Sequence, residues 1–461
     1  MDRVGLVGQL NINNSTRGSN MINSPSNTGP VCLNIGLALS VLVALLAEGG
    51  VKAAEPPLRN VSPPARISGL PSVSVDASRV TYITKVVRER GEQQRNQIFL
   101  WSDDPRRRSL ISRNGGGKQA VGGSLYPMIS GDGSVVVFAS DATDIDPGCA
   151  VPGVMNVFRQ GVLERETPPL CLSIPATGGP SDGDSLYPAV SGDGRVVSWA
   201  SSASNLVQGD SNGMPDVFVR GADGVIQRAS IATGGEPGDG VSSLSSLNGD
   251  GSRIVFMSEA TNLVGDDSNG VSDIFLRDLA RGETTRISMS SAGAQANGPS
   301  YGPVFSAGGR YVGFVSAASN LVEGDSNGKR DVFLRDLDTG KTERVSVATG
   351  GGQANGDSDY VSVTADGRCV AFQSDAGNLV PGDGNGNDDV FVHDRKTGET
   401  IRVSLTSKGK EARGAAFFPV ISADGSAVVF TSDAPGLTPT ADRKKDDPDV
   451  YLRRLASGWC R

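Results

Sequence analysis

The stretch YPAVSGDGRVVSWASSASNLVQGDSNGMPDVFVR, residues 187–220, contains a pattern that recurs along most of the chain. An apolar segment leads through Asp193 and Gly194 into a second apolar run around Trp199, and a third segment around Phe218 follows a loop. Asp-Gly favours a tight hairpin turn because glycine takes a positive φ without steric cost. Apolar runs without alternation are typical of strands buried on both faces. The stretch therefore predicts consecutive antiparallel strands.

Two aromatic positions mark this unit in seven copies. The second strand carries Tyr82, Phe138, Trp199, Phe256, Phe314, Phe372 and Phe430, and the last four of these are 58 residues apart. The third strand carries Phe99, Phe158, Phe218, Phe275, Phe333, Phe391 and Tyr451. A fourth strand ends in Arg-Ile-Ser or Arg-Val-Ser, as at residues 286–288 and 344–346. Seven repeats of four antiparallel strands predict an all-β, seven-bladed β-propeller over residues 55–461.

The last repeat lacks a fourth strand, because only LASGWCR follows the third strand at 449–454. Before the first repeat, residues 65–68 read Ala-Arg-Ile-Ser and match the usual end of a fourth strand. We therefore expect residues 61–68 to complete the last blade. Such closure protects strand edges that would otherwise aggregate.

The repeat motifs S-x-D-G-R-x-V-x-F-x-S and D-V-F-x-R-D resemble those of TolB-type, WD40-like propellers of exported bacterial proteins. Examples are residues 191–195 (SGDGR) and 331–336 (DVFLRD), and the resemblance covers residues 65–461. It implies a propeller fold and specifies function poorly. Residues 55–70 are too few for the α/β domain that precedes the propeller in TolB itself, so the partners of TolB are not carried over.

The composition excludes several classes of function. The chain has 43 Lys and Arg against 51 Asp and Glu, a net charge of −8 and a pI near 5.0, which argues against nucleic acid or an anionic membrane as the main partner. One histidine, His393, is present, so the commonest acid–base catalyst and metal ligand is almost missing. His393 stands where other repeats have Arg220, Arg277 or Arg335, and this indicates a substituted strand position.

Residues 1–54 read as a leader. Residues 35–46 (IGLALSVLVALL) form an uncharged apolar run of the length of a secretory signal core, and small residues near Ala53 and Ala54 suit cleavage. The alternative is an uncleaved membrane anchor over residues 31–47. Either reading places the propeller outside the cytoplasm, in the periplasm or the exterior.

Four cysteines lie beyond Cys32 of the leader, and they allow three pairings. A disulfide between Cys149 and Cys171 is the most plausible bridge in an oxidising compartment. We expect it to hold the loop of the second repeat, which lacks the acidic pattern described next. Cys369 lies inside a strand and is expected to be a small buried hydrophobic residue.

Four repeats carry Asp-x-Asn-Gly-x-x-Asp between the second and third strands. The residues are Asp210, Asn212 and Asp216; Asp267, Asn269 and Asp273; Asp325, Asn327 and Asp331; and Asp383, Asn385 and Asp389. Oxygen ligands at this spacing around a glycine turn resemble short loops that wrap Ca²⁺, so one hypothesis is a structural calcium site in each loop. The other is a set of metal-free Asx turns, in which Asp and Asn bond to the backbone.

No nucleophile motif or histidine cluster accompanies the repeats. We therefore expect a non-enzymatic, monomeric binding scaffold whose partner is a protein, or a glycan, of the cell envelope or exterior. The alternative is a glycoside hydrolase or polysaccharide lyase that works with carboxylates alone on an extracellular polymer.

Overall fold

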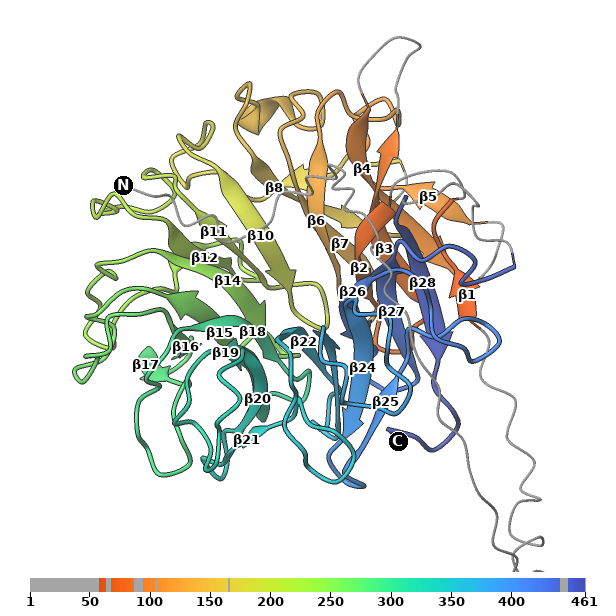
Figure 1. The fold of residues 1–461 in the computed structure, drawn as a ribbon. Coiled ribbons are helices and arrows are strands. Elements are labelled where there is room, and N and C mark those ends of the chain that lie inside the picture. The colour runs from red at the N-terminus through yellow and green to blue at the C-terminus, as the bar shows by residue number, and fades with distance from the viewer. Residues whose placement is uncertain are drawn as a thin grey trace, which may run out of the picture. The chain divides into compact units, whose positions relative to one another are not determined.

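Seven four-stranded antiparallel sheets follow one another around a ring, in chain order (Figure 1). The computed structural model describes residues 58–63, 68–86, 94–103, 107–164, 166–439 and 447–460. The predicted seven-bladed β-propeller is confirmed. The predicted leader, residues 1–54, lies outside the described residues. Among those residues, no helix has the length and hydropathy needed to cross a membrane.

Six blades are built from four consecutive strands each. Blades 1 to 3 consist of β2 Ser68–Val73, β3 Arg79–Val86, β4 Arg95–Ser102 and β5 Arg108–Leu110; β6 Ser124–Ile129, β7 Val135–Ser140, β8 Asn156–Gly161 and β9 Leu170–Cys171; and β10 Ser185–Val190, β11 Val197–Ser201, β12 Asp216–Arg220 and β13 Ile226–Arg228. Blades 4 to 6 consist of β14 Ser242–Leu247, β15 Arg253–Ser258, β16 Asp273–Asp278 and β17 Glu283–Arg286; β18 Ser300–Phe305, β19 Tyr311–Ser316, β20 Asp331–Asp336 and β21 Thr342–Arg344; and β22 Ser358–Val363, β23 Cys369–Ser374, β24 Asp389–Asp394 and β25 Glu399–Arg402.

The two aromatic columns form the core of the blades. In blade 4, Phe256 of the second strand pairs with Phe275 of the third, and the same register recurs in every blade. The seven ring pairs stack with centroids between 5.7 and 6.5 Å apart. Such a pair contributes about 0.5–1.5 kcal/mol beyond the burial of its area. The columns visible in the sequence are therefore the packing units of the propeller.

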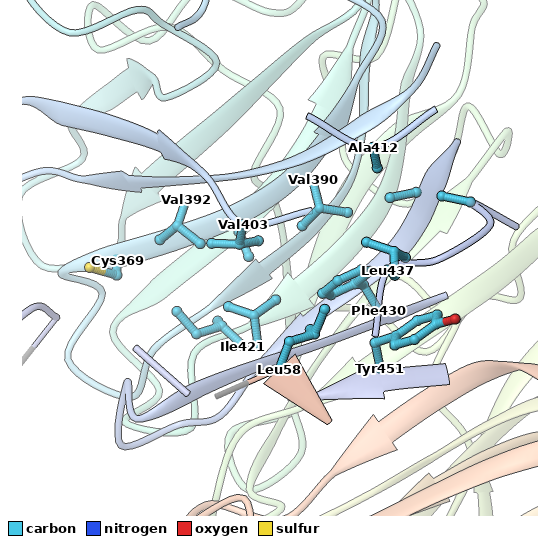
Figure 2. Close-up of a cluster of buried hydrophobic side chains, with 14 of the residues drawn as sticks. Leu58, Cys369, Val390, Val392, Val403, Ala412, Ile421, Phe430, Leu437 and Tyr451 are labelled. Atoms are coloured by element: carbon cyan, nitrogen blue, oxygen red, sulfur yellow. The ribbon is translucent and has the colours of Figure 1, made fainter. Parts of the chain in front are cut away.

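Blade 7 closes the ring with a strand from the N-terminal side. It contains β26 Ala416–Ile421, β27 Ala427–Ser432 and β28 Asp449–Arg454, and β1 Leu58–Asn60 pairs antiparallel with β28. Leu58 packs in the same buried cluster as Phe430 and Tyr451 (Figure 2). Closure by an N-terminal strand is thus confirmed.

The range predicted for this closure, residues 61–68, was only partly right, because Val61 and Ser62 contact β28 but the paired strand itself precedes them. The fourth-strand position of blade 7 is held by residues 58–62, whereas Ser68 is the first residue of β2 in blade 1. Residues 64–67, which carry the matching Arg-Ile motif, lie outside the described part. Asn60 pairs with Tyr451 as Arg286 pairs with Phe275, and Ser62 donates to Asp449 Oδ1 at 2.7 Å. The serine hydroxyl, rather than the arginine, is what the closing strand shares with the other blades.

Cys369 is not a free buried residue, contrary to the expectation from its strand. It forms a disulfide with Cys460, which follows the last strand of the chain. Both residues are buried. The bridge ties the C-terminal segment to β23 of blade 6.

Candidate functional site: the acidic loops and the central channel

The acidic loops converge on an arginine from the fourth strand of their own blade. In blade 5, Arg344 Nη1 lies 3.0 Å from Asp325 Oδ1 and 3.2 Å from Asp331 Oδ2, and all three side chains are buried. Arg228, Arg286 and Arg402 take the same place in blades 3, 4 and 6. Each loop therefore brings its two predicted carboxylates together around a guanidinium.

The asparagine of each loop is used by the turn. In blade 5, Asn327 Oδ1 accepts the backbone N–H of Lys329 at 3.0 Å, and Asn327 Nδ2 donates to Asp331 Oδ2 at 2.8 Å. Asn212, Asn269 and Asn385 make the same two bonds. The amide nitrogen, not the oxygen, therefore faces the carboxylates. This is the arrangement of an Asx turn.

A serine completes each network. Ser346 Oγ donates to Asp331 Oδ1 at 2.6 Å and accepts the backbone N–H of Val332 at 3.1 Å, so the fourth strand is locked to the third. In this geometry a calcium ion would compete with Arg344 for the same carboxylate oxygens. Calcium binding stays a prediction, and the observed contacts account for the loops without it.

Blade 6 adds a carboxylate that sequence reasoning missed. Carboxylate oxygens of Asp383, Asp389 and Glu411 lie within 4.8 Å of one another, and Arg402 Nη1 is 3.0–3.1 Å from all three residues. Burial raises the pKa of Asp389, although Arg402 opposes it. The sequence does place Glu411 at a repeat position, because Gln295, Gln353 and Glu411 are spaced 58 residues apart. The four acidic loops remain separate networks and do not form a common site.

Blade 2 replaces the ion pair with a covalent bond. Cys171 pairs with Phe158 in the register that Arg286 has with Phe275, and it forms a disulfide with Cys149. Cys149 ends the short 3₁₀ helix η1, Pro147–Cys149, in the loop that carries the aspartates elsewhere. The bridge therefore joins the same two elements as the Arg–Asp contacts do.

His393 lies in a structural position. It is buried, and its Nδ1 lies 2.9 Å from Thr400 Oγ1. Burial lowers the pKa of His393, so the neutral ring is favoured. Arg277 and Arg335 contact the equivalent threonines, Thr284 and Thr342. His393 thus replaces an arginine at an equivalent strand position, as the sequence predicts.

The first strands of the blades contact one another in sequence, and β26 contacts β2, so these strands surround the central channel. The third residue of every first strand has a left-handed backbone conformation. These residues are Leu70, Tyr126, Tyr187, Leu244, Gly302, Tyr360 and Phe418, with φ between +48° and +55°. A register shift in each strand pair accompanies this conformation, as expected for a β-bulge.

Aromatic side chains from this ring meet in the channel. The rings of Tyr126 and Tyr187 lie 4.6 Å apart, and those of Tyr360 and Phe418 lie 4.8 Å apart. Burial raises the pKa of Tyr126, and the neighbouring Tyr187 raises it further. Tyr360 is 48% exposed, so part of its ring faces solvent.

These channel residues were not identified from the sequence. A non-glycine residue at positive φ costs about 1–3 kcal/mol, and such residues cluster at functional sites. Here six of seven equivalent positions carry that cost, and only Gly302 avoids it. The repeated Tyr-Pro and Phe-Pro pairs of the first strands were visible, but the backbone conformation was not. The channel ring is therefore the strongest candidate site.

No protein-family model and no curated protein sequence matches the chain. Solved structures do match. The propeller domain of the Trilobed protease from Pyrococcus furiosus covers 85% of this chain and 94% of its own, with a TM-score of 0.52 and 10% identity. An oligogalacturonate lyase solved with manganese covers 88% and 95%, with a TM-score of 0.51 and 12% identity.

TolB proteins are also among the matches, as the repeat motifs predict. A putative TolB from Agrobacterium tumefaciens covers 76% of this chain and 95% of its own, with a TM-score of 0.41 and 15% identity. Identities of 10–15% show the fold alone. Because one match is a lyase and another a protease domain, the fold does not decide between a binding protein and an enzyme.

Proposed function

We propose that the protein is a non-enzymatic, exported scaffold that binds a segment of another protein in its central channel. The single observation that carries this proposal is the ring of strained residues at the third position of the first strands. Six non-glycine residues pay a conformational cost there, and several of them present aromatic surface. Exposed aromatic rings supply large contact area at low entropic cost, which suits recognition of an extended segment.

The contacts of the acidic-loop carboxylates support binding rather than catalysis. The aspartates of the acidic loops each contact an arginine or a serine of their own blade, and His393 is buried against Thr400. A general acid or base needs access to its substrate. The alternative of a carboxylate-based hydrolase or lyase is tested by incubating the protein with acidic and neutral polysaccharides and following new reducing or unsaturated ends.

The two disulfides support export, because such bonds persist in oxidising compartments. We therefore place the protein in the periplasm or the exterior, as a monomer. The partner we expect is a protein of the cell envelope, and a glycan is the second choice because sugars also stack on aromatic rings.

Tyr360→Gly tests the channel without threatening the fold. Gly302 holds the equivalent position in blade 5, so glycine is compatible with this backbone. Photo-crosslinking from Met128, an exposed residue of the same channel strands, would capture the partner from envelope extract. We expect Tyr360→Gly to reduce the crosslinked product at least several-fold while the melting temperature stays the same or rises.

Met214→Ser is the matched control, since Met214 is 43% exposed and lies in an acidic loop outside the channel. If Met214→Ser loses the crosslinked product and Tyr360→Gly keeps it, the partner binds at the acidic loop that holds Met214 and not in the channel. Retention in both variants would remove the support for binding in the channel.

A further inference from the structure

A cleft of about 490 Å³ lies between blades 2 and 3, away from the channel ring. Its lining includes Arg159, Leu170 and Leu172 of blade 2 and Arg195, Val197 and Arg220 of blade 3. Three arginines and three aliphatic residues thus share one concave surface on a protein of net charge −8.

A hydrogen bond that joins each of blades 4 to 6 to the blade before it is missing at this cleft. In blades 4 to 6, a threonine of the fourth strand donates its Oγ1 hydrogen to a carbonyl of the preceding blade at 2.6 Å. These threonines are Thr284, Thr342 and Thr400. In blade 3 the position is held by Ile226, which pairs with Arg220 as Thr284 pairs with Arg277. Isoleucine has no hydroxyl, so it cannot bridge to blade 2 in this way.

The fourth strand of blade 2 leaves the cleft open as well. β9 consists of Leu170 and Cys171 only, and Pro168 and Pro169 before it have no backbone N–H to extend the pairing. Leu170 is 52% exposed, which is unusual for a leucine in a propeller strand. Val225, next to the lining residue Gly224, is another of the large apolar residues that are exposed in the described chain.

The arginines of the cleft are poorly neutralised. Arg220 Nη1 donates to Leu172 O at 3.0 Å, and Arg159 Nε donates to Gly194 O at 3.5 Å. Within the described residues neither of them has a carboxylate at ion-pair distance. Arg195 Nε is 3.6 Å from Asp193 Oδ2 but its side chain is 74% exposed, so this pair is weak.

Arg335 shows what Arg220 lacks. Arg335 Nη1 reaches two carbonyls of blade 4 and Thr342 Oγ1, whereas Arg220 has the single carbonyl of Leu172. Burial also lowers the pKa of Arg220, because taking a guanidinium out of water without a counter-charge is unfavourable. A bound carboxylate would supply the missing partner in the two-pronged geometry that guanidinium groups favour.

We propose that this cleft binds an extended peptide segment of another protein that carries carboxylates next to aliphatic side chains. The arginines would pair with the carboxylates, and the exposed side chain of Leu170 would contact the aliphatic groups, since Leu172 and Val197 belong to the buried core between the blades. A small anion would use the charges but not the apolar surface, which is why a peptide fits the lining better. The proposal does not rest on binding in the channel.

The test uses the full-length oxidised protein and a fluorescein-labelled peptide of alternating Glu and Leu, followed by fluorescence anisotropy. The same peptide with Lys in place of Glu is the charge control. We expect saturable binding of the Glu peptide only, weakened about tenfold by Arg159→Ala alone and more strongly by Arg159→Ala with Arg195→Ala, since each lost charge-assisted contact corresponds to about 1.4 kcal/mol or more. Leu170→Ser should also weaken it, because the aliphatic contact is lost.

Arg281→Ala is the matched control, because Arg281 has a 73% exposed side chain and pairs with an aspartate in a turn of blade 4. We expect it to bind the peptide like the unmodified protein, and so should Tyr360→Gly. The latter result would separate this cleft from the channel, whichever way the channel experiment turns out.

Four outcomes would overturn the proposal. The first is that the Glu peptide does not bind up to about 1 mM, and the second is that the Lys peptide binds equally well. The third is that the Arg159 and Arg195 variants bind the Glu peptide as the unmodified protein does. The fourth is that equimolar inorganic phosphate displaces the peptide fully, which indicates a small-anion site. A further experiment measures co-sedimentation of the protein with vesicles that contain anionic lipid. Co-sedimentation that depends on the same arginines, without peptide binding, would assign the cleft to a membrane surface instead.

Discussion

Ser62→Ala tests how the ring is closed. Ser62 is buried, donates to Asp449 Oδ1 at 2.7 Å, and accepts the backbone N–H of Val450 at 3.0 Å. A hydrogen bond to a charged group contributes about 1.5–3 kcal/mol, and a buried N–H left without its acceptor costs about 1–3 kcal/mol. The substitution should therefore lower the free energy of unfolding by about 2.5–6 kcal/mol.

Ser346→Ala is the matched comparison inside the ring. Ser346 donates to Asp331 Oδ1 at 2.6 Å and accepts the N–H of Val332 at 3.1 Å, so the same two bonds are lost. Urea denaturation of both variants gives the two changes in free energy, and hydrogen exchange at the amides of Val332 and Val450 locates the opening. We expect losses of similar size, with faster exchange at Val450 in Ser62→Ala only.

A neutral Ser62→Ala beside a destabilised Ser346→Ala would refute the reasoning. The fourth strand of blade 7 would then contribute little, and the ring would be held without residues 58–62. Fast exchange at Val450 in the unmodified protein would lead to the same conclusion, because it would mean that β1 is detached from β28 in solution.

Three further predictions concern charge, covalent closure and metal. Arg310 holds the pKa of Asp336 below its usual range, so their pairing stabilises the fold above the ordinary Asp pKa of about 3.9 and fades as pH falls through the lower folded value. Arg310→Ala should thus melt at a lower temperature than the unmodified protein at neutral pH, and this difference in melting temperature should become smaller below about pH 4. A difference that becomes larger there would contradict the prediction. Joint replacement of Cys369 and Cys460 by alanine should cost about 4–5 kcal/mol in urea denaturation, because their separation of 91 residues closes a long loop, and an unchanged midpoint would argue against the bridge. Because Arg344 already contacts both loop carboxylates of its blade, we expect equal melting temperatures in Ca²⁺ and in EDTA, and a clear rise with Ca²⁺ would favour calcium in the loops.

Most of the fold could be predicted because its determinants are local and repeated. Asp193 and Gly194 specify a turn, and the aromatic columns at Trp199 and Phe218 return at a fixed period. The position of the closing strand could not be found in the same way. Its fourth-strand motif has Asn60 in place of arginine, so the arginine at residue 66 favoured residues 61–68, whereas the shared requirement is the serine that reaches Asp449.

The candidate sites depend on features that spacing does not reveal. The calcium hypothesis for the acidic loops rests on Asp325, Asn327 and Asp331, which carry oxygen atoms at suitable intervals. Arg344, which contacts both carboxylates, comes from a different strand, and only the pairing of β20 with β21 brings it there. The left-handed conformation of Tyr360 likewise has no sequence signature of its own, since glycine is the residue that usually marks it.

The repeat itself separates structural from functional positions. Wherever a position fulfils one structural role, the blades use equivalent chemistry, as when the disulfide of Cys171 joins the elements that Arg286 joins by ion pairs. Among the described residues, the threonine contact between blades is made only by blades 4 to 6, and Ile226 of blade 3, like Leu58 of blade 7, has no hydroxyl to make it. Beside Ile226, Arg220 has a single carbonyl acceptor, and Leu170 of the short strand β9 is 52% exposed. A departure that costs inter-blade contact and leaves charge unpaired is best explained by a ligand that restores both, and this is why we place a second binding surface there.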